Sequence, residues 1–270
     1  VLKNPETNST IKAIASKSEV HRLLICSALS DKKTSVLCEE LNEDIIATVD
    51  CLTALGAEIS YEDKTFSVTP VRELASSPVL PCNESGSTLR FLLPFVCASG
   101  KGGTFDTRGR LSRRPLTPLK EELEKSGAVI NTADNLISVS GKCSSDSFTL
   151  PGNVSSQFIS GLMFMLSGTG GTINVTGNIE SRPYIEMTAY ALKKFGCEVH
   201  FSENVITVEK TCPLISPVEI TSSGDWSNAA FFITLGVIGK KAITVTSLDP
   251  SSKQGDKEIV NILKREIENA

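Results

Sequence analysis

Three short stretches place small hydroxyl residues directly before long apolar runs. They read SKSEVHR at 16–22, ESGSTLR at 84–90 and VSSQF at 154–158. A helix that begins at such a stretch presents free backbone N–H groups and a partial positive charge, and together these bind anions. Lys17 and Arg22 add cations that suit phosphate or carboxylate groups. The alternative for any single serine is plain N-capping, but the set predicts a site for an anionic small molecule.

A second concentration of cations lies at 101–114, where KGGTFDTRGRLSRR holds five basic residues and one acidic residue. Arginine guanidinium groups form two-pronged hydrogen bonds with phosphate and carboxylate groups. Nucleic-acid binding is disfavoured, because Phe105 is the one aromatic residue among these cations and the whole chain has a net charge of −4. The stretch is therefore either part of an anion site or a solvated loop.

The hydroxyl stretches recur at a nearly fixed distance, which indicates an internal repeat. The serines beside the apolar runs lie 69, 69 and 71 residues apart: Ser18, Ser87, Ser156 and Ser227. The glycines that follow a second, amphipathic segment lie 71 and 69 residues apart: Gly56, Gly127 and Gly196. Each apolar run predicts a helix buried on most sides. Each amphipathic segment predicts a helix that ends at a left-handed glycine.

Two alternating segments around a polar turn follow each glycine and predict β-hairpins at 57–70, 128–141 and 197–210. A β-branched run, such as GGTINVTG or KKAITVTS, joins the two helices of each unit. The unit is therefore β-α-β-α-β-β. Apolar helices beside amphipathic strands predict an α/β (α+β) fold of inside-out barrel type, in which helices are buried and sheets face solvent.

Three complete units predict one domain at 16–222, and the residues at 1–14 and 224–270 predict part of a second domain of the same type. The fourth unit lacks its hairpin before Ala270, which favours truncation over a divergent terminal cap. Its apolar helix at 229–238 would then present six large side chains to water. A patch of that size favours self-association or local instability.

Composition excludes several other classes of protein. Hydrophobic residues make up 40% of the chain and charged residues 21%, as in globular proteins. The longest near-apolar stretch, 229–239, is too short to span a bilayer, and no signal peptide is visible. The eight cysteines are scattered without a CxxC pair, so we expect no metal site and a reducing, cytoplasmic setting. We expect no membrane partner.

Six motifs, taken in order, resemble those of the 5-enolpyruvylshikimate-3-phosphate synthases, an enolpyruvyl transferase family. Besides the three hydroxyl stretches, they are RRP at 113–115, ESRPYIEMT at 180–188 and SGDWSNAAFF at 223–232. The resemblance covers essentially the whole chain, although family members are longer. It implies two inside-out α/β domains and no cofactor. It also implies enolpyruvyl transfer from phosphoenolpyruvate to the 5-hydroxyl of shikimate 3-phosphate, with release of phosphate.

The resemblance implies roles for individual residues. Lys17 matches the lysine that touches both substrates and is the expected catalytic residue, either as a proton carrier or as a charge clamp. The expected substrate-binding residues are Ser18 and Arg22 at the shikimate hydroxyl and carboxylate, Ser155, Ser156 and Ser181 at phosphoshikimate, Gln157 between the substrates, Tyr184 beside the ring, and Gly86 and Arg114 at phosphoenolpyruvate. Arg90 is expected to support that last loop. Glu84 and Ser87 depart from the Asn and Thr that are common in the family.

The same resemblance implies that the acid/base carboxylates and the later cationic clamps of the family lie beyond residue 270. We therefore expect this chain alone to bind shikimate 3-phosphate without turnover. One alternative is a non-catalytic module that captures phosphoshikimate. Another is the sister family that uses UDP-N-acetylglucosamine. Members of that family tend to carry a Cys in the loop that here reads TRGRLSRRP, and this loop contains no Cys, which disfavours the alternative.

Overall fold

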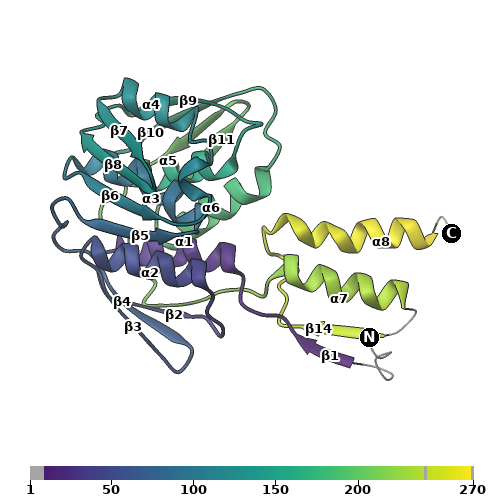
Figure 1. The fold of residues 1–270 in the computed structure, drawn as a ribbon. Helices are drawn as coiled ribbons and strands as arrows, with labels where there is room; N and C mark the ends of the chain where they lie inside the picture. The colour runs from purple at the N-terminus through teal and green to yellow at the C-terminus, as the bar shows by residue number, and fades with distance from the viewer. Residues whose placement is uncertain (1–8, 240–241, 269–270) are drawn as a thin grey trace.

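The computed structural model describes residues 9–239 and 242–268. Figure 1 shows a larger body, which contains helices α1 to α6, and a smaller body, to which both ends of the chain contribute. Two connections, at 13–16 and 222–225, join the bodies and pair through an antiparallel bridge between Ala15 and Gly224. The other residues of the expected second domain, at 1–8, 240–241 and 269–270, lie outside the described ranges.

The larger body has three inner helices and three outer ones. The inner helices are α1 (Lys17–Ala28), α3 (Gly86–Ser99) and α5 (Ser156–Thr169). The outer helices are α2 (Glu43–Ala54), α4 (Leu119–Lys125) and α6 (Arg182–Lys194). Leu24, Leu93 and Leu162 of the inner helices are fully buried. The prediction that the apolar helices form the interior is confirmed.

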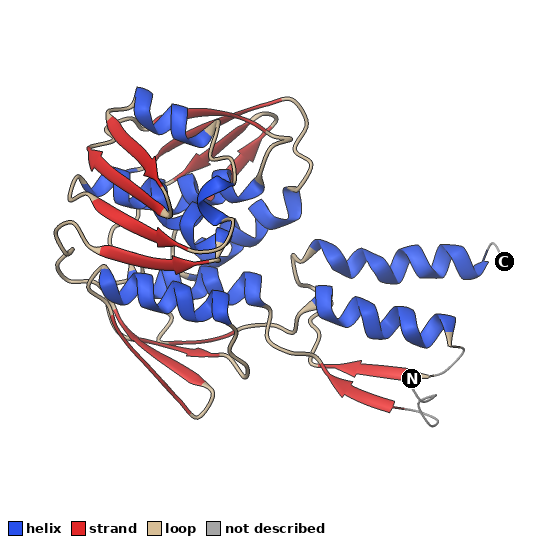
Figure 2. Ribbon diagram, viewed as in Figure 1, coloured by secondary structure: helices blue, strands red, loops and turns tan. Residues whose placement is uncertain are grey.

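Three four-stranded sheets lie outside these helices (Figure 2). The first, in the order β5-β6-β8-β7, contains Val79–Asn83, Gly103–Thr107, Leu136–Gly141 and Ala128–Ala133. The second, in the order β11-β12-β10-β9, contains Val199–Ser202, Val205–Val208, Gly171–Thr176 and Ser147–Pro151. The third, in the order β13-β2-β4-β3, contains Glu219–Thr221, Thr34–Leu37, Thr65–Thr69 and Glu58–Glu62.

The predicted β-α-β-α-β-β unit is present from β5 to β8 and again from β9 to β12. All three predicted hairpins form: β3 with β4, β7 with β8, and β11 with β12. The first unit differs, because its first strand is β13, which pairs in parallel with β2 through Glu219 and Ser35. The last strand of the larger body therefore completes the third sheet, which is the sheet of the first unit.

Inner helices α3 and α5 approach closely at Gly161. A Cβ atom at this position would collide with the backbone carbonyl oxygen of Arg90. Because glycine has no side chain, the two helices can cross at backbone contact. This contact holds the N-terminal ends of both helices near each other.

The smaller body is a two-stranded parallel sheet with two helices. Its elements are β1 (Ser9–Lys12), β14 (Ile243–Thr246), α7 (Trp226–Ile238), the 3₁₀ turn η2 (Gly255–Glu258) and α8 (Ile259–Glu268). The expected exposure of α7 needs correction. Only three of its six large apolar side chains are exposed, namely Phe231, Leu235 and Ile238, while Phe232, Ile233 and Val237 are half-buried.

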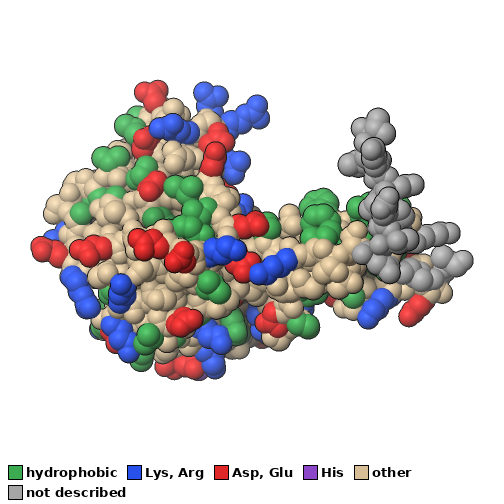
Figure 3. Space-filling model, turned by 90° about the horizontal axis from the view of Figure 1, so that it is seen from below, with side chains coloured by type: hydrophobic (Ala, Val, Ile, Leu, Met, Phe, Trp, Pro, Cys, Tyr) green, Lys and Arg blue, Asp and Glu red, His purple; other side chains and the backbone are tan. Residues whose placement is uncertain are grey.

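Acidic and basic side chains are interspersed over the face of the larger body that Figure 3 shows. In the part of the chain that the structure describes, no helix has the length and apolar character needed to cross a bilayer. The same residues bring no three His, Cys, Asp or Glu side chains together as metal ligands. The eight cysteines are free, and seven of them are buried.

Candidate functional site

The N-terminal ends of four helices, α1, α3, α5 and α6, border one cavity of about 390 Å³. Eight of the ten residues singled out in the sequence line it: Lys17, Ser18, Arg22, Ser155, Ser156, Gln157, Ser181 and Tyr184. Ser87 and Phe91 of α3 also line it. The repeat thus brings equivalent helix ends to one place, as the spacing predicts.

The serines at these helix ends fall into two groups. Ser85 and Ser155 act as N-caps, since their hydroxyls accept hydrogen bonds from the backbone N–H groups of Thr88 and Gln157. Among the described residues, by contrast, the hydroxyls of Ser18, Ser156 and Ser181 have no hydrogen-bond partner in the protein. These three hydroxyls are therefore available to a ligand.

Arg22 is 2% exposed and holds two helices together. Its Nε donates to Oγ1 of Thr188 at 2.7 Å, and its Nη atoms donate to the carbonyl oxygens of Ser18 at 2.6 Å and Tyr184 at 3.0 Å. Burial lowers the pKa of the guanidinium to about 10, so it stays charged at neutral pH. Because a guanidinium carries five N–H donors, two remain for a ligand. The sequence predicted that Arg22 binds a ligand, but it did not reveal that Arg22 also joins α1 to α6.

Lys17 is held by a carboxylate that sequence reasoning did not single out. Its Nζ lies 2.7 Å from Oδ2 of Asp44, in the first turn of α2, and both side chains are partly exposed. Burial acts to raise the pKa of Asp44, but the hydrogen bond and charge of Lys17 outweigh it and leave that pKa lowered. The ammonium group of Lys17 therefore has a fixed partner at the cavity mouth.

Gly86 and Arg114 lie beside the cavity and do not line it. A Cβ at Gly86 would come within 2.6 Å of a guanidinium nitrogen of Arg90 and 3.4 Å of one of Arg114. Arg114 directly follows the 3₁₀ turn η1 (Leu111–Arg113) in the basic stretch. The missing side chain of Gly86 therefore leaves room for two guanidinium groups at the start of α3. Arg114 is thus the one residue of the basic stretch that the described contacts place beside Gly86, and all five basic residues of the stretch are exposed.

Gln157 connects these arginines to the cavity. It accepts a hydrogen bond from Nη1 of Arg90 at 2.9 Å and donates one to Oγ of Ser87 at 3.0 Å. Burial, and then the positive charge of Arg114, lower the pKa of Arg90. The two groups of expected substrate contacts are thus neighbours, with Gln157 between them.

A second carboxylate missed in the sequence comes from the smaller body. Oδ2 of Asp256 accepts hydrogen bonds from the hydroxyl of Tyr184 at 3.1 Å and from that of Ser227 at 2.6 Å. The preceding Gly255 lies against Pro183, where a Cβ would come within 3.2 Å. The smaller body therefore places a carboxylate beside Tyr184 at this site.

The repeat contained a clue to both carboxylates. Asp44 and Tyr184 each stand twelve residues before the glycine of their unit, at the start of the second helix. Asp256 stands at the corresponding place in the fourth unit, just before α8. The family resemblance singled out Ser181 and Tyr184 at the start of α6, but Asp44 and Asp256, at the corresponding places of two other units, were overlooked.

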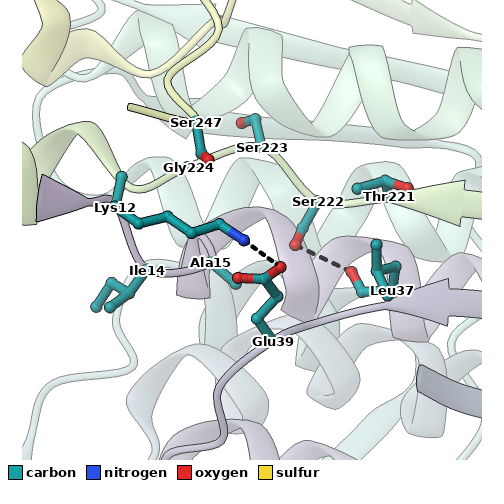
Figure 4. Close-up of a pocket in the computed structure, with 11 residues that line it drawn as sticks. Lys12, Ile14, Ala15, Leu37, Glu39, Thr221, Ser222, Ser223, Gly224 and Ser247 are labelled. Atoms are coloured by element: carbon teal, nitrogen blue, oxygen red, sulfur yellow. Dashed lines mark hydrogen bonds and ion pairs between the residues drawn. The ribbon is translucent and has the colours of Figure 1, made fainter. Parts of the chain in front are cut away.

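Another cavity, of about 190 Å³, lies between the two connections (Figure 4). Figure 4 shows Lys12 and Glu39 facing each other across it as an ion pair. Beside this ion pair, the hydroxyl of Ser222 donates to the carbonyl oxygen of Leu37 at 3.2 Å. Because Lys12 is already paired, this cavity suits an anion less well than the one at the helix ends.

Comparisons with known proteins show the family to which the whole chain is similar. The model of the family described as EPSP synthase (3-phosphoshikimate 1-carboxyvinyltransferase) matches residues 2–268. The curated 3-phosphoshikimate 1-carboxyvinyltransferase of Clostridium beijerinckii is 33% identical over 267 residues, which cover 94% of this chain and 61% of the relative. That of Clostridium perfringens is 36% identical over 270 residues, which cover 96% and 63%.

Solved structures agree on the fold. An EPSP synthase from Acinetobacter baumannii superposes with a TM-score of 0.79 at 20% sequence identity, over 97% of this chain and 60% of that one. The chain thus spans less than two thirds of the length of these relatives. Since the family model covers nearly every residue, the chain belongs to the EPSP synthase (3-phosphoshikimate 1-carboxyvinyltransferase) family.

Proposed function

We propose that this chain binds shikimate 3-phosphate in the cavity at the helix ends. The observation that carries the proposal is the convergence of the N-terminal ends of α1 and α5 on one space with Arg22 and unpartnered hydroxyls. The start of α5, with Ser156, and the nearby hydroxyl of Ser181 suit a phosphate group. The two unused N–H groups of Arg22 suit a carboxylate. Shikimate 3-phosphate carries both a phosphate and a carboxylate.

We further propose that the site serves enolpyruvyl transfer from phosphoenolpyruvate. The 5-hydroxyl of shikimate 3-phosphate loses its proton, and its oxygen forms a bond to C2 of phosphoenolpyruvate. At the same time C3 of phosphoenolpyruvate gains a proton, and the product of this step is a tetrahedral ketal. Breakage of the C–O bond to phosphate and loss of a proton from C3 then restore the double bond and release inorganic phosphate. Asp256 at the rim is suited to accept the hydroxyl proton, and Lys17 to carry a proton or to balance charge.

The geometry supports binding more strongly than turnover. The described cations at and beside the cavity include Lys17, which is paired with Asp44, and Arg114 and Arg90 beside Gly86. Because the chain spans 61% and 63% of the two curated relatives, we propose that it holds shikimate 3-phosphate without steady turnover by itself. The free cysteines favour a reducing compartment such as the cytoplasm.

Calorimetric titration of the chain with shikimate 3-phosphate tests the proposal, with unphosphorylated shikimate as the matched ligand. We expect shikimate to bind about ten- to a hundredfold more weakly, because charge-assisted hydrogen bonds to the phosphate are worth roughly 1.5–3 kcal/mol. Absence of heat with millimolar shikimate 3-phosphate would contradict the binding proposal. Steady phosphate release when phosphoenolpyruvate is added would contradict the proposal that the chain does not turn over.

A further inference from the structure

A buried glutamine holds the start of α7 in the smaller body. Gln254, directly before η2, is 4% exposed. Its Oε1 accepts a hydrogen bond from the backbone N–H of Trp226 at 2.9 Å, and its Nε2 donates to the carbonyl oxygen of Gly224 at 2.8 Å. Because the first N–H groups of a helix have no partner within that helix, Gln254 completes the N-terminal end of α7.

These two backbone partners fix the orientation of the side-chain amide. A backbone N–H only donates and a carbonyl oxygen only accepts, so Oε1 must face Trp226 and Nε2 must face Gly224. Nε2 also lies 3.1 Å from Oγ of Ser223 and 3.2 Å from Oγ of Ser252. An amide carries a donor and an acceptor side by side, whereas an ionised carboxylate of the same size has no donor. The site therefore requires a glutamine rather than a glutamate.

Ser223 connects this glutamine to the larger body. The backbone N–H and the hydroxyl of Ser223 both donate to Oε2 of Glu19, at 2.8 and 2.6 Å. Because the single hydroxyl proton of Ser223 is committed to Glu19, its oxygen accepts from Nε2 of Gln254. Glu19 lies in the first turn of α1. The network therefore runs from α1, through the connection at 222–225, to the residue before η2.

Two residues after Gln254, the carboxylate of Asp256 reaches the candidate site. Its Oδ2 accepts hydrogen bonds from Ser227 of α7 at 2.6 Å and from Tyr184 of α6 at 3.1 Å. A Cβ atom on Gly255, which lies in between, would come within 3.2 Å of α6. The backbone that leads to Asp256 is thus held to the start of α7 by Gln254 and packs against α6 at Gly255.

We propose that Gln254 is a positioning residue for the candidate site. Bound to the start of α7, and to α1 through Ser223 and Glu19, it fixes where η2 begins and thereby places Asp256 against Tyr184. None of its described hydrogen bonds reaches a residue that lines the cavity, so it acts through Asp256. The proposal rests on the proposed function only for what Asp256 does to a bound ligand.

The titration of Tyr184 reports whether Asp256 is in place, and it needs no ligand. Burial, and then the charge and hydrogen bond of Asp256, raise the pKa of Tyr184. Gln254→Met keeps the length of the side chain but removes its hydrogen-bonding groups, so we expect it to lower the pKa of Tyr184. NMR of the ring carbon that bears the hydroxyl measures this pKa, and Tyr184→Phe identifies the signal. An unchanged pKa in folded Gln254→Met would overturn the proposal.

Two adjacent serines form a matched pair that tests the link to α1. Ser223→Ala removes the hydroxyl that joins α1 to Gln254. Ser222→Ala removes a hydroxyl that donates instead to the carbonyl oxygen of Leu37 at 3.2 Å. We expect Ser223→Ala to lower the pKa of Tyr184 and Ser222→Ala to leave it unchanged. Equal pKa values in the two variants would overturn the proposal, and this pair decides even if Gln254→Met fails to fold.

Thr34→Val controls for a general loss of stability. Thr34 is fully buried, and its hydroxyl lies 2.7 Å from that of Ser216, beyond the C-terminal end of α1. We expect Thr34→Val to lower the unfolding free energy, as Gln254→Met does, without changing the pKa of Tyr184. A fall of this pKa in both variants would overturn the proposal. Because no ligand is present, failure of the chain to bind shikimate 3-phosphate would contradict the proposed function and leave this test decisive.

Discussion

The hydroxyl of Tyr184 donates a hydrogen bond of 3.1 Å to Oδ2 of Asp256, and this contact joins the two bodies at the rim of the candidate site. Tyr184 belongs to the first turn of α6, and Asp256 to η2. Burial, and then the charge of Asp256, raise the pKa of Tyr184, so the phenol stays a donor. The smaller body therefore contributes a carboxylate to a site otherwise built by the larger body.

Tyr184→Phe should loosen this junction while keeping the aromatic ring. We expect the free energy of local opening at 255–258 to fall by roughly 1 kcal/mol, because one hydrogen bond to a partly exposed carboxylate is lost. Hydrogen exchange read by mass spectrometry measures the change. The control is Tyr61→Phe, whose hydroxyl donates to the carbonyl oxygen of Cys38 within the larger body. An equal effect of both variants at 255–258 would show that the bond does not hold the bodies together.

Arg22→Ala should weaken both ligand binding and stability. We expect a loss of about ten- to a hundredfold in affinity for shikimate 3-phosphate, and roughly 3 kcal/mol of unfolding free energy, because three internal hydrogen bonds disappear as well. Calorimetry and urea unfolding measure the two effects. Arg182→Ala is the control, since Arg182 is exposed and pairs only with Glu186 in the described structure.

Ser156→Ala should affect binding alone. Its hydroxyl lines the cavity, and we expect a loss of about two- to tenfold in affinity, with little change in the unfolding midpoint. Calorimetry at the salt concentration used for Arg22→Ala allows the two variants to be ranked. If Ser156→Ala cost more affinity than Arg22→Ala, the assignment of the phosphate and carboxylate ends would be wrong.

The buried ring of His21 predicts acid sensitivity. Its pKa is lowered from 6.5 to about 3, so between these values the unfolded chain binds a proton that the folded chain does not. Stability therefore falls as the pH drops below about 6.5, by at most about 1.4 kcal/mol per pH unit. His21→Asn should flatten the curve of unfolding free energy between about pH 5 and 6.5, and the exposed-site control His200→Asn should not. Parallel curves for the unmodified chain and His21→Asn would contradict this origin.

The smaller body should be the least stable part of the molecule. Phe231 and Ile238 of α7 are 76% and 75% exposed, so their burial adds little there, whereas α1, α3 and α5 are enclosed. We expect residues 226–238 to exchange amide hydrogens at far lower opening free energy than the inner helices in dilute monomer. Sedimentation should show concentration-dependent association that Phe231→Ser reduces. Uniform protection in a verified monomer would favour a self-sufficient smaller body.

Local patterns were sufficient for most of the fold. Apolar runs predicted α1, α3 and α5, and alternation around polar turns predicted the three hairpins, because each depends on neighbours in the sequence. The pairing of β13 with β2 was not predictable in this way. Its partners, such as Glu219 and Ser35, are far apart in the chain, and only closure of the three-unit body brings them together.

The sequence predicted the site residues that depend only on where a helix begins. It did not predict contacts between side chains of different helices or bodies. Residues such as Ser156 line the cavity because they begin inner helices. The internal hydrogen bonds of Arg22 depend on how α6 packs against α1, which no local pattern contains. Asp44 and Asp256 enter through second helices and through the contact between bodies, so they became visible only in the structure.

The most direct test of the central claim is a crystal structure of the chain grown with shikimate 3-phosphate. We predict the phosphate at the N-terminal end of α5, within hydrogen-bond distance of Ser156 and Ser181, and the carboxylate against the two unused N–H groups of Arg22. The 5-hydroxyl should then face Lys17 and Asp256. Ligand bound elsewhere, or bound with the phosphate at Arg22 and away from α5, would contradict the account.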